Sequence, residues 1–218
     1  GSGNDGLFIN ANASGQGDIR AFGALDSTID AGSGDDAISI NASANSNNGG
    51  WWWRGGNDPA TARGLDNSDV DLGSGNDFIN INANANSNGG WWWGRGGNAD
   101  SVGIDNNSSV NTGAGNDSVF VNSFAAGAAT NAWAIRDSSI DVGSGDDFVS
   151  LNASTFQTQR RYDPAYGSEN SSIDLGSGND RLFINANASG QGEMRAFGAL
   201  DSTIDAGSGD DAVSINAS

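Results

Sequence analysis

A five-residue turn motif recurs seven times along the chain and constrains its fold more than any other feature. The motif is Gly, then Ser or Ala, then Gly, then Asn or Asp, and then Asp in every copy. The copies begin at residues 1, 32, 73, 113, 143, 176 and 207, which places them 30 to 41 residues apart. Recurrence at this period is typical of a solenoid, in which each repeat forms one coil and contacts only its neighbours.

The residues after each turn alternate between apolar and polar. In the third copy they read Phe78-Ile-Asn-Ile-Asn-Ala-Asn84, which predicts a strand with Ile79 and Ile81 inward and Asn82 outward. We therefore expect an all-β fold, a parallel β-solenoid with a thin aliphatic core. The inward residues expected in the other coils are Ile29, Ile38, Ile40; Val70; Val110, Val119, Val121; Ile140, Val149, Leu151; Ile173, Leu182, Ile184; and Ile204, Val213, Ile215. One outward column is expected to form an amide ladder: Asn10, Asn41, Asn82, Asn122, Asn152, Asn185 and Asn216.

The coils are also grouped into a longer sequence repeat. Residues 1–43 recur at 176–218 with four differences, so five coils make one super-repeat of 175 residues. No boundary divides the seven coils, and residues 1–218 are expected to form one continuous solenoid. Because the chain begins and ends inside the pattern, we expect it to be a window of a longer array.

The composition restricts the ligands and partners of the chain. Its net charge is −18, and 27 acidic residues include only two Glu, Glu169 and Glu193. Since the chain has no His and no Cys, oxygen atoms are the available metal ligands, which suit hard cations and not transition metals. So negative a chain is not expected to bind nucleic acid, and no membrane span is expected.

Stacking the coils brings the last Asp of every turn into a column. Neighbouring carboxylates about 4.8 Å apart repel one another by about 1 to 3.5 kcal/mol. A divalent cation between the turns converts this repulsion into attraction, and calcium is the expected ion. The candidate ligands are Asp5, Asp36, Asp77, Asp117, Asp147, Asp180 and Asp211. Backbone support is expected from Gly1, Gly3, Gly32, Gly34, Gly73, Gly75, Gly113, Gly115, Gly143, Gly145, Gly176, Gly178, Gly207 and Gly209.

A second polar column lies two residues before each turn. Its side chains either support the cation or simply face solvent, and the sequence leaves both alternatives open. They are Asp30, Asp71, Asn111, Asp141, Asp174 and Asp205.

The turns resemble the RTX, or hemolysin-type, calcium-binding nonapeptide repeat, G-G-x-G-x-D-x-U-x. Residues 72–80 match it at every position except the first Gly. The resemblance implies a right-handed parallel β-roll in which the motif Asp and turn carbonyls hold several calcium ions between successive turns. In that family two nonapeptides form each coil. Here each coil has one, so we expect calcium along one edge and long variable loops along the other.

Aromatic residues concentrate in the variable parts of the coils. The triplets Trp51, Trp52, Trp53 and Trp91, Trp92, Trp93 lie in consecutive coils, where three adjacent rings cannot all point inward. They either cover the open edge of the coil or provide a surface for lateral fibre packing or glycan contact. Phe156, Tyr162, Tyr166 and Trp133 are expected to act similarly in other loops.

These features favour a structural protein over an enzyme, because carboxylates that recur in every coil indicate a scaffold. We expect an extracellular or cell-surface filament that self-associates, exported by bacterial type I secretion as the RTX resemblance implies. The repeat also loosely resembles oscillin-type surface fibrils. The alternatives are a calcium-folded spacer of a large secreted adhesin or toxin and, less favoured, an ice-binding surface.

Overall fold

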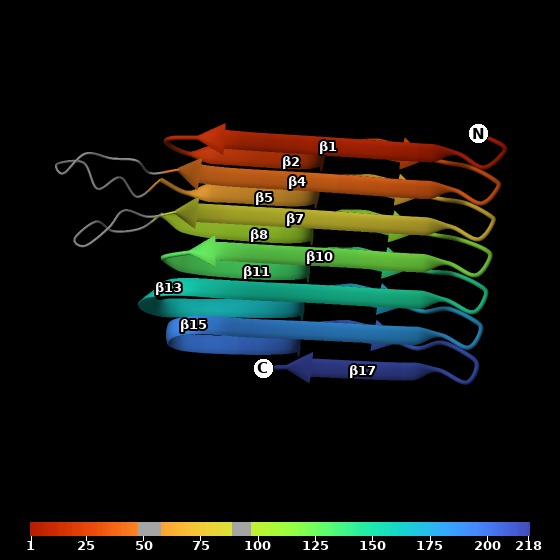
Figure 1. Ribbon diagram of the computed structural model, residues 1–218. Coiled ribbons are helices and arrows are strands. Elements are labelled where there is room, and N and C mark those ends of the chain that lie inside the picture. The colour runs from red at the N-terminus through yellow and green to blue at the C-terminus, as the bar shows by residue number, and fades with distance from the viewer. Residues whose placement is uncertain (48–57, 89–96) are drawn as a thin grey trace.

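The computed structural model describes residues 1–47, 58–88 and 97–218 as a parallel β-solenoid (Figure 1). Each coil has a long strand, a return strand and a short strand that leads into the next turn. In Figure 1 the long strands run to the left in front of the return strands, and the coils descend from the N-terminus. This arrangement is right-handed, and it confirms the predicted fold class. Within the described ranges no helix is long and apolar enough to cross a membrane.

Three sets of strands repeat along the solenoid axis. The long strands are β1 (Gly6–Gly15), β4 (Ala37–Asn47), β7 (Phe78–Asn88), β10 (Ser118–Gly127), β13 (Phe148–Glu169), β15 (Arg181–Leu200) and β17 (Ala212–Ala217). The return strands are β2 (Ile19–Leu25), β5 (Ala60–Asp66), β8 (Asn98–Asp105) and β11 (Ala129–Arg136), and they continue into the second halves of β13 and β15. The short strands are β3 (Thr28–Asp30), β6 (Asp69–Asp71), β9 (Ser109–Asn111), β12 (Ser139–Asp141), β14 (Ser172–Asp174) and β16 (Thr203–Asp205).

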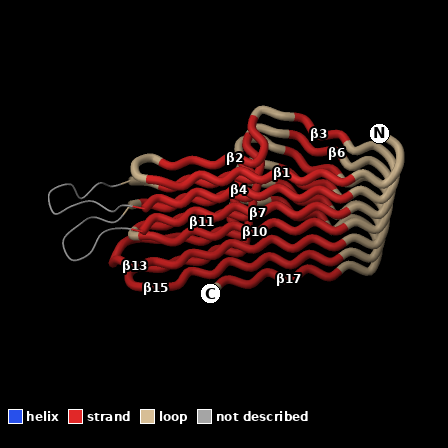
Figure 2. Tube along the Cα trace, turned by 45° about the horizontal axis from the view of Figure 1, so that its top comes forward, coloured by secondary structure: helices blue, strands red, loops and turns tan. Residues whose placement is uncertain are grey.

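Neighbouring coils pair in parallel, and equivalent motif positions face each other. Ile38 pairs with Ile79, for example, and Ile140 with Ile173. Isolated bridges continue the pairing through the middle residues of the turns, from Ser2 to Ser208. All seven turns consequently lie along one edge, on the right in Figure 2.

The core is a narrow stack of aliphatic side chains between the long, return and short strands. The expected inward residues are buried in the inner coils: Ile79 and Ile81 of β7, for example, are 0% exposed. Leu72, which directly precedes its turn, is equally buried. The period-two pattern therefore identified the inward face of the inner long strands correctly. In β17 the predicted inward residues Val213 and Ile215 pair with the buried Leu182 and Ile184 but are themselves 45 and 46% exposed.

The variable part of each coil contains more strand than its sequence indicates. The return strands are recognised by their packing, because each places a small residue against an inward residue of a long strand. A Cβ atom added to Gly64 of β5 would lie 2.2 Å from Cγ2 of Ile81 and 2.5 Å from the backbone oxygen of Gly103. The absence of a side chain lets the two sheets and the adjacent coils approach closely.

Candidate functional site

The turns stack directly on one another through their backbones. The N–H of Ser74 donates to Gly32 O at 3.1 Å, and the N–H of Gly34 donates to Ser74 O at 2.8 Å. Gly73 and Gly75 have φ angles of 89° and 139°, in the region that favours glycine. A Cβ at either residue would also lie within 2.0 Å of a glycine oxygen in the preceding turn. Positive φ and close stacking together explain why both motif glycines recur.

The last Asp of each turn forms a continuous column, here called the aspartate column: Asp5, Asp36, Asp77, Asp117, Asp147, Asp180 and Asp211. The backbone N–H of each residue donates to Oδ1 of the next residue in the column, at 2.7 to 2.9 Å. The five inner carboxylates are 0 to 3% exposed. The structure thus brings together the predicted ligand residues, and each Oδ1 already accepts one N–H.

The second oxygen of each inner carboxylate has no such partner. Oδ2 is buried and accepts no hydrogen bond in the five inner residues, Asp36, Asp77, Asp117, Asp147 and Asp180. A buried, unpaired carboxylate oxygen is costly, since native proteins pair nearly all such groups. Five in a row indicate a common partner, either a proton or a cation.

The buried position of these carboxyls raises their pKa values. Burial, opposed by the N–H bond from Asp36 and reinforced by the charges of its neighbours, raises the pKa of Asp77 to about 6. The same causes raise the pKa of Asp147 to about 7. Burial is also the main reason that the pKa values of Asp117 and Asp180 are raised. The column therefore disfavours uncompensated negative charge.

A second column, one residue earlier in each turn, avoids this problem. It consists of Asn4, Asp35, Asn76, Asn116, Asp146, Asn179 and Asp210, so no two Asp residues are adjacent. Here each backbone N–H donates to Oδ1 of the preceding coil, at 2.7 to 3.1 Å. The exposed column dilutes its charge with asparagine, whereas the buried aspartate column does not. The contrast indicates that the buried charges are compensated.

The donor atoms fit a hard cation. Each of the five inner turns supplies one unpaired carboxylate oxygen, and the carbonyl oxygens of both turn glycines point along the axis toward the next turn. In the described part of the chain no cluster of three or more acidic, His or Cys side chains could hold a metal. A cation here would therefore depend on backbone oxygens as well as on Oδ2, and oxygen-only ligation is what Ca²⁺ prefers.

The polar column two residues before the turn faces solvent. All six of its side chains are exposed. Two of them, Asp174 and Asp205, accept the N–H of their own turn glycine through Oδ1, at 3.0 Å in both cases. These residues therefore face solvent and order the entrance to the turn. They are Asp30, Asp71, Asn111, Asp141, Asp174 and Asp205.

The predicted amide ladder is confirmed over six coils. The side-chain Nδ2 of Asn82 donates to Oδ1 of Asn41 at 2.8 Å. The bonds continue at 3.0 to 3.1 Å through the later coils. The ladder comprises Asn41, Asn82, Asn122, Asn152, Asn185 and Asn216. Asn10 was also predicted, but its Oδ1 accepts from Asn12 at 2.9 Å and Asn41 donates to Ser39 instead.

The sequence did not reveal a serine ladder at the corner between return and short strands. Within it, Ser68 Oγ accepts the N–H of Ser27 at 3.1 Å and donates to Asp66 O at 2.9 Å. The recurring Asp-Ser or Asn-Ser pair was its signal, but a hydroxyl in a polar segment resembles an ordinary surface residue. The serine ladder comprises Ser27, Ser68, Ser108, Ser138, Ser171 and Ser202.

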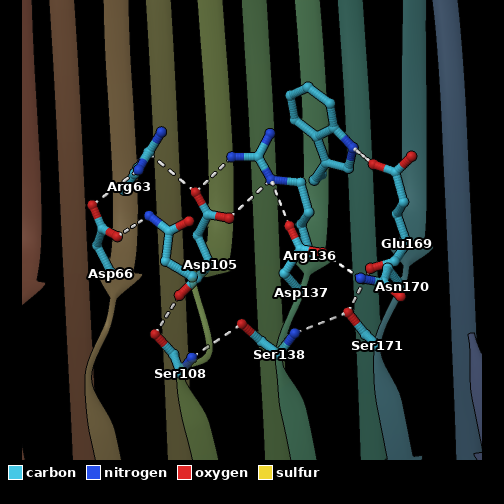
Figure 3. A network of polar contacts seen from close by, with 12 residues as sticks. Arg63, Asp66, Asp105, Ser108, Arg136, Asp137, Ser138, Glu169, Asn170 and Ser171 are labelled. Atoms are coloured by element: carbon cyan, nitrogen blue, oxygen red, sulfur yellow. Dashed lines mark hydrogen bonds and ion pairs between the residues drawn. The ribbon is translucent and has the colours of Figure 1, made fainter.

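A charged network joins the outer side of the return strands (Figure 3). Asp105, 0% exposed, accepts two bonds from Arg136 at 2.8 and 2.7 Å. Nε of Arg63 lies 3.2 Å from Oδ2 of the same carboxylate. Two arginines from different coils thus compensate one buried acid. Charge compensation occurs here through side chains, which the aspartate column lacks.

The aromatic residues differ from their prediction. Trp133 and Tyr166 lie in strands, not loops, and are only 9% and 8% exposed. Their rings stack with centroids 5.5 Å apart, and the Arg136 guanidinium lies 4.4 Å from the Trp133 ring centroid. Coil stacking buries the faces of rings whose sequence context resembled a loop. Phe156 also lies in a strand, β13, and not in a loop, although its side chain is 51% exposed. The Trp triplets lie outside the described residues.

Comparison with known proteins returned no match: no protein-family model and no curated protein matches this chain.

Proposed function

We propose that this chain is a calcium-stabilised structural repeat, which forms part of an extracellular filament or surface coat. The observation that carries the proposal is the aspartate column, with one buried and unpaired carboxylate oxygen in each inner turn. Asp36, Asp77, Asp117, Asp147 and Asp180 would hold the ions through Oδ2, together with turn carbonyl oxygens. Asp5 and Asp211 would do so in the first and last turns. When bound, calcium supplies positive charge that links successive coils.

The proposed role is structural because the recurring polar groups maintain the stack. The aspartate column, the serine ladder and the amide ladder all bond one coil to the next. The super-repeat of residues 1–43 at 176–218 shows that the same coils recur along the axis. Repetition of this kind builds length at about 4.8 Å per coil, as a filament requires.

An extracellular location follows from the calcium part of the proposal. At low cytosolic calcium a chain with a net charge of −18 is kept from compact stacking by repulsion between its turns. Millimolar calcium outside the cell favours the folded coils by mass action. Folding is thereby coupled to export, in agreement with the type I secretion that the RTX resemblance implies.

The stacked geometry also suits a spacer in a large secreted adhesin or toxin. A rod of parallel coils holds a terminal binding or catalytic domain away from the cell surface. The two hypotheses differ in the assembly state of the repeat itself, because a spacer remains a monomer whereas a filament segment associates.

Circular dichroism and electron microscopy, with calcium and after excess chelator, test the proposal. We expect a β-sheet spectrum and fibres in calcium, and reversible loss of both on chelation. A folded monomer in calcium would favour the spacer. A spectrum and fibres that do not respond to chelation would refute the role of calcium.

A further inference from the structure

The front face of the solenoid consists of the outward side chains of β1, β4, β7, β10 and β17 and of the first halves of β13 (148–158) and β15 (181–190). Among its described side chains Arg181 is the one charged group, although the chain has 36 charged residues, 27 acidic and 9 basic. The rest are Asn, Ser, Phe, Thr, Ala and Gly. The described acidic side chains lie on the turn edge, on the other two faces and at the bend after β1. The front face, with one charged group, therefore offers a highly charged protein one side on which like molecules can meet.

Phenylalanine is concentrated on this face. Seven of the nine Phe residues of the chain lie there: Phe8, Phe78, Phe120, Phe124, Phe148, Phe156 and Phe183. Five of these seven are 36 to 66% exposed. Exposed apolar side chains gathered on one flat surface mark an interaction site, whereas scattered ones do not.

The Phe residues form a zigzag across four consecutive coils. The ring centroids of Phe78 and Phe120 are 5.6 Å apart, those of Phe120 and Phe148 5.3 Å, and those of Phe148 and Phe183 5.6 Å. The rings are tilted by 37 to 40° to one another. They make a continuous apolar ridge that runs along the solenoid axis.

The amide ladder runs beside this ridge, and its hydrogen bonds lower the cost of burying the face in an interface that excludes water. Asn122 donates to Asn82 and accepts from Asn152, both at 3.0 Å. Each inner amide therefore has part of its hydrogen bonding satisfied within the chain. Burial of such amides costs less than burial of free ones, because fewer groups lose their partners.

We propose that the front face docks onto the front face of a second copy of this chain. A second copy has the same coil spacing, so its amide ladder, and its ridge in the four coils that carry one, match this copy coil by coil, as facing sheets do in stacked β assemblies. A ten-residue strand by seven coils covers roughly 33 by 34 Å, or about 1,100 Å², more than the roughly 800 Å² per partner of a stable interface. The inference rests on the proposed structural role and identifies the surface for lateral contact within it.

The test is the assembly state in solution, measured by sedimentation velocity in calcium at about 100 μM protein, where micromolar association is visible. The variant is Phe120→Ser with Phe148→Ser. Serine already occupies these columns in adjacent coils, at Ser150 and Ser118, so the fold tolerates it. We expect the parent chain to form dimers or larger species and the variant to sediment as a monomer.

Two further variants test whether association depends on the front face and not on exposed apolar residues in general. Met194→Ser removes a side chain of similar exposure, 41%, from the return half of β15, and we expect it to associate like the parent. Ser150→Asp adds a charge to the front face, and we expect it to dissociate the assembly most at low salt. A monomeric parent chain, or a double Phe variant that associates equally, overturns the proposal. Binding of the monomer to insoluble cellulose or chitin through the same Phe residues also overturns it and indicates a glycan partner.

Circular dichroism on the same samples separates this proposal from that of calcium. A chain that is folded with or without calcium disproves the metal role, but its association can still be measured. A chain that folds only in calcium and remains a monomer supports the metal role and disproves the docking surface.

Discussion

The N–H of Asp77 donates to Oδ1 of Asp117 in the next coil at 2.7 Å, while Oδ2 of the same carboxylate is buried without a hydrogen-bond partner. One oxygen of each inner carboxylate thus joins two coils, and the other remains available. The N–H of Asp117 donates in the same way to Oδ1 of Asp147. The carboxylates of the column are therefore close enough for their charges to act on one another. Neutralisation of these carboxylates, by protons or by a cation, would therefore decide whether the column stabilises or destabilises the fold.

Asp117→Asn is expected to change stability in opposite directions with and without calcium. The asparagine oxygen can still accept the N–H of Asp77, but the free carboxylate oxygen is lost. In calcium we expect a loss of about 1 to 3 kcal/mol, as for removal of a buried charged partner. In chelator we expect a gain, because repulsion along the column falls. Urea unfolding followed by circular dichroism in both buffers measures the two effects.

Asp35→Asn is the matched control for this experiment. Asp35 lies one residue earlier in a turn, in the exposed column, where asparagine already occupies the flanking coils as Asn4 and Asn76. We expect its stability to change by less than about 0.5 kcal/mol in either buffer. Equal effects of the two substitutions would contradict a specific role for the buried carboxylate.

Without calcium the folded chain should lose stability as the pH rises. Burial raises the pKa of Asp77 to about 6 and that of Asp147 to about 7, from 3.8. A carboxyl with a raised folded-state pKa binds its proton more tightly in the folded chain, so its contribution is fully present below 3.8 and is lost through pH 6 to 7. The urea midpoint in chelator should therefore be higher at pH 5 than at pH 8.

Asp147→Asn provides the control for the pH dependence. It removes the carboxyl with the higher of the two pKa values, so the difference in urea midpoint between pH 5 and pH 8 should become smaller. Saturating calcium should also reduce or reverse this difference, since calcium and protons compete for the same oxygens. An unchanged pH dependence in the variant would show that other groups determine it.

The sequence predicts those parts of the fold that depend on local pattern. Turn glycines and period-two alternation are local, so the turn edge, the inward Ile81 and the ladder through Asn82 could all be predicted. The return strands could not, because Gly64 is defined by its contact with Ile81 and not by its neighbours in sequence. Trp133 was misassigned for a similar reason, since stacking on the adjacent coil buries a ring that its sequence context exposes.

The candidate site likewise has features that the local sequence predicts and features that only the fold determines. Asp117 could be chosen from its recurrence in every turn, but the orientation of its two oxygens requires the adjacent coil. Ser68 was overlooked because its burial depends on the corner formed with the preceding return strand. Positions that contact only the next coil carry a periodic signal, whereas contacts across the coil do not.

Ser68→Ala is expected to destabilise the chain by about 1 to 3 kcal/mol. The Ser68 side chain is 1% exposed, accepts the N–H of Ser27 and donates to Asp66 O, so alanine removes both bonds and leaves the Asp66 oxygen without that donor. The control is Ser139→Ala, at a half-buried position on β12, which should stay within about 0.5 kcal/mol. Urea unfolding in calcium compares them. Equal losses at both positions would show that the serine ladder has no special role.

Gly64→Ala is expected to destabilise the chain by about 1 to 3 kcal/mol through overpacking, because its Cβ would meet Cγ2 of Ile81. Another coil of the repeat contains a pair of residues that accommodates alanine at this position. By register, Ala134 occupies the corresponding position of β11, and the long strand of the next coil, β13, has Leu151 where Gly64 meets Ile81.

Leucine has no Cγ2 on its β-carbon, so the added methyl group has room. Glycine stands at the same position wherever the long strand of the next coil places Ile40, Val121, Ile184 or Ile215 against it. We therefore expect Gly64→Ala combined with Ile81→Leu to recover most of the stability lost by Gly64→Ala alone. Ile81→Leu by itself should cost less than about 1.5 kcal/mol. Additive losses in this double-mutant cycle, measured by urea unfolding, would show that the close approach to the Gly103 oxygen, and not the Ile81 methyl, excludes alanine.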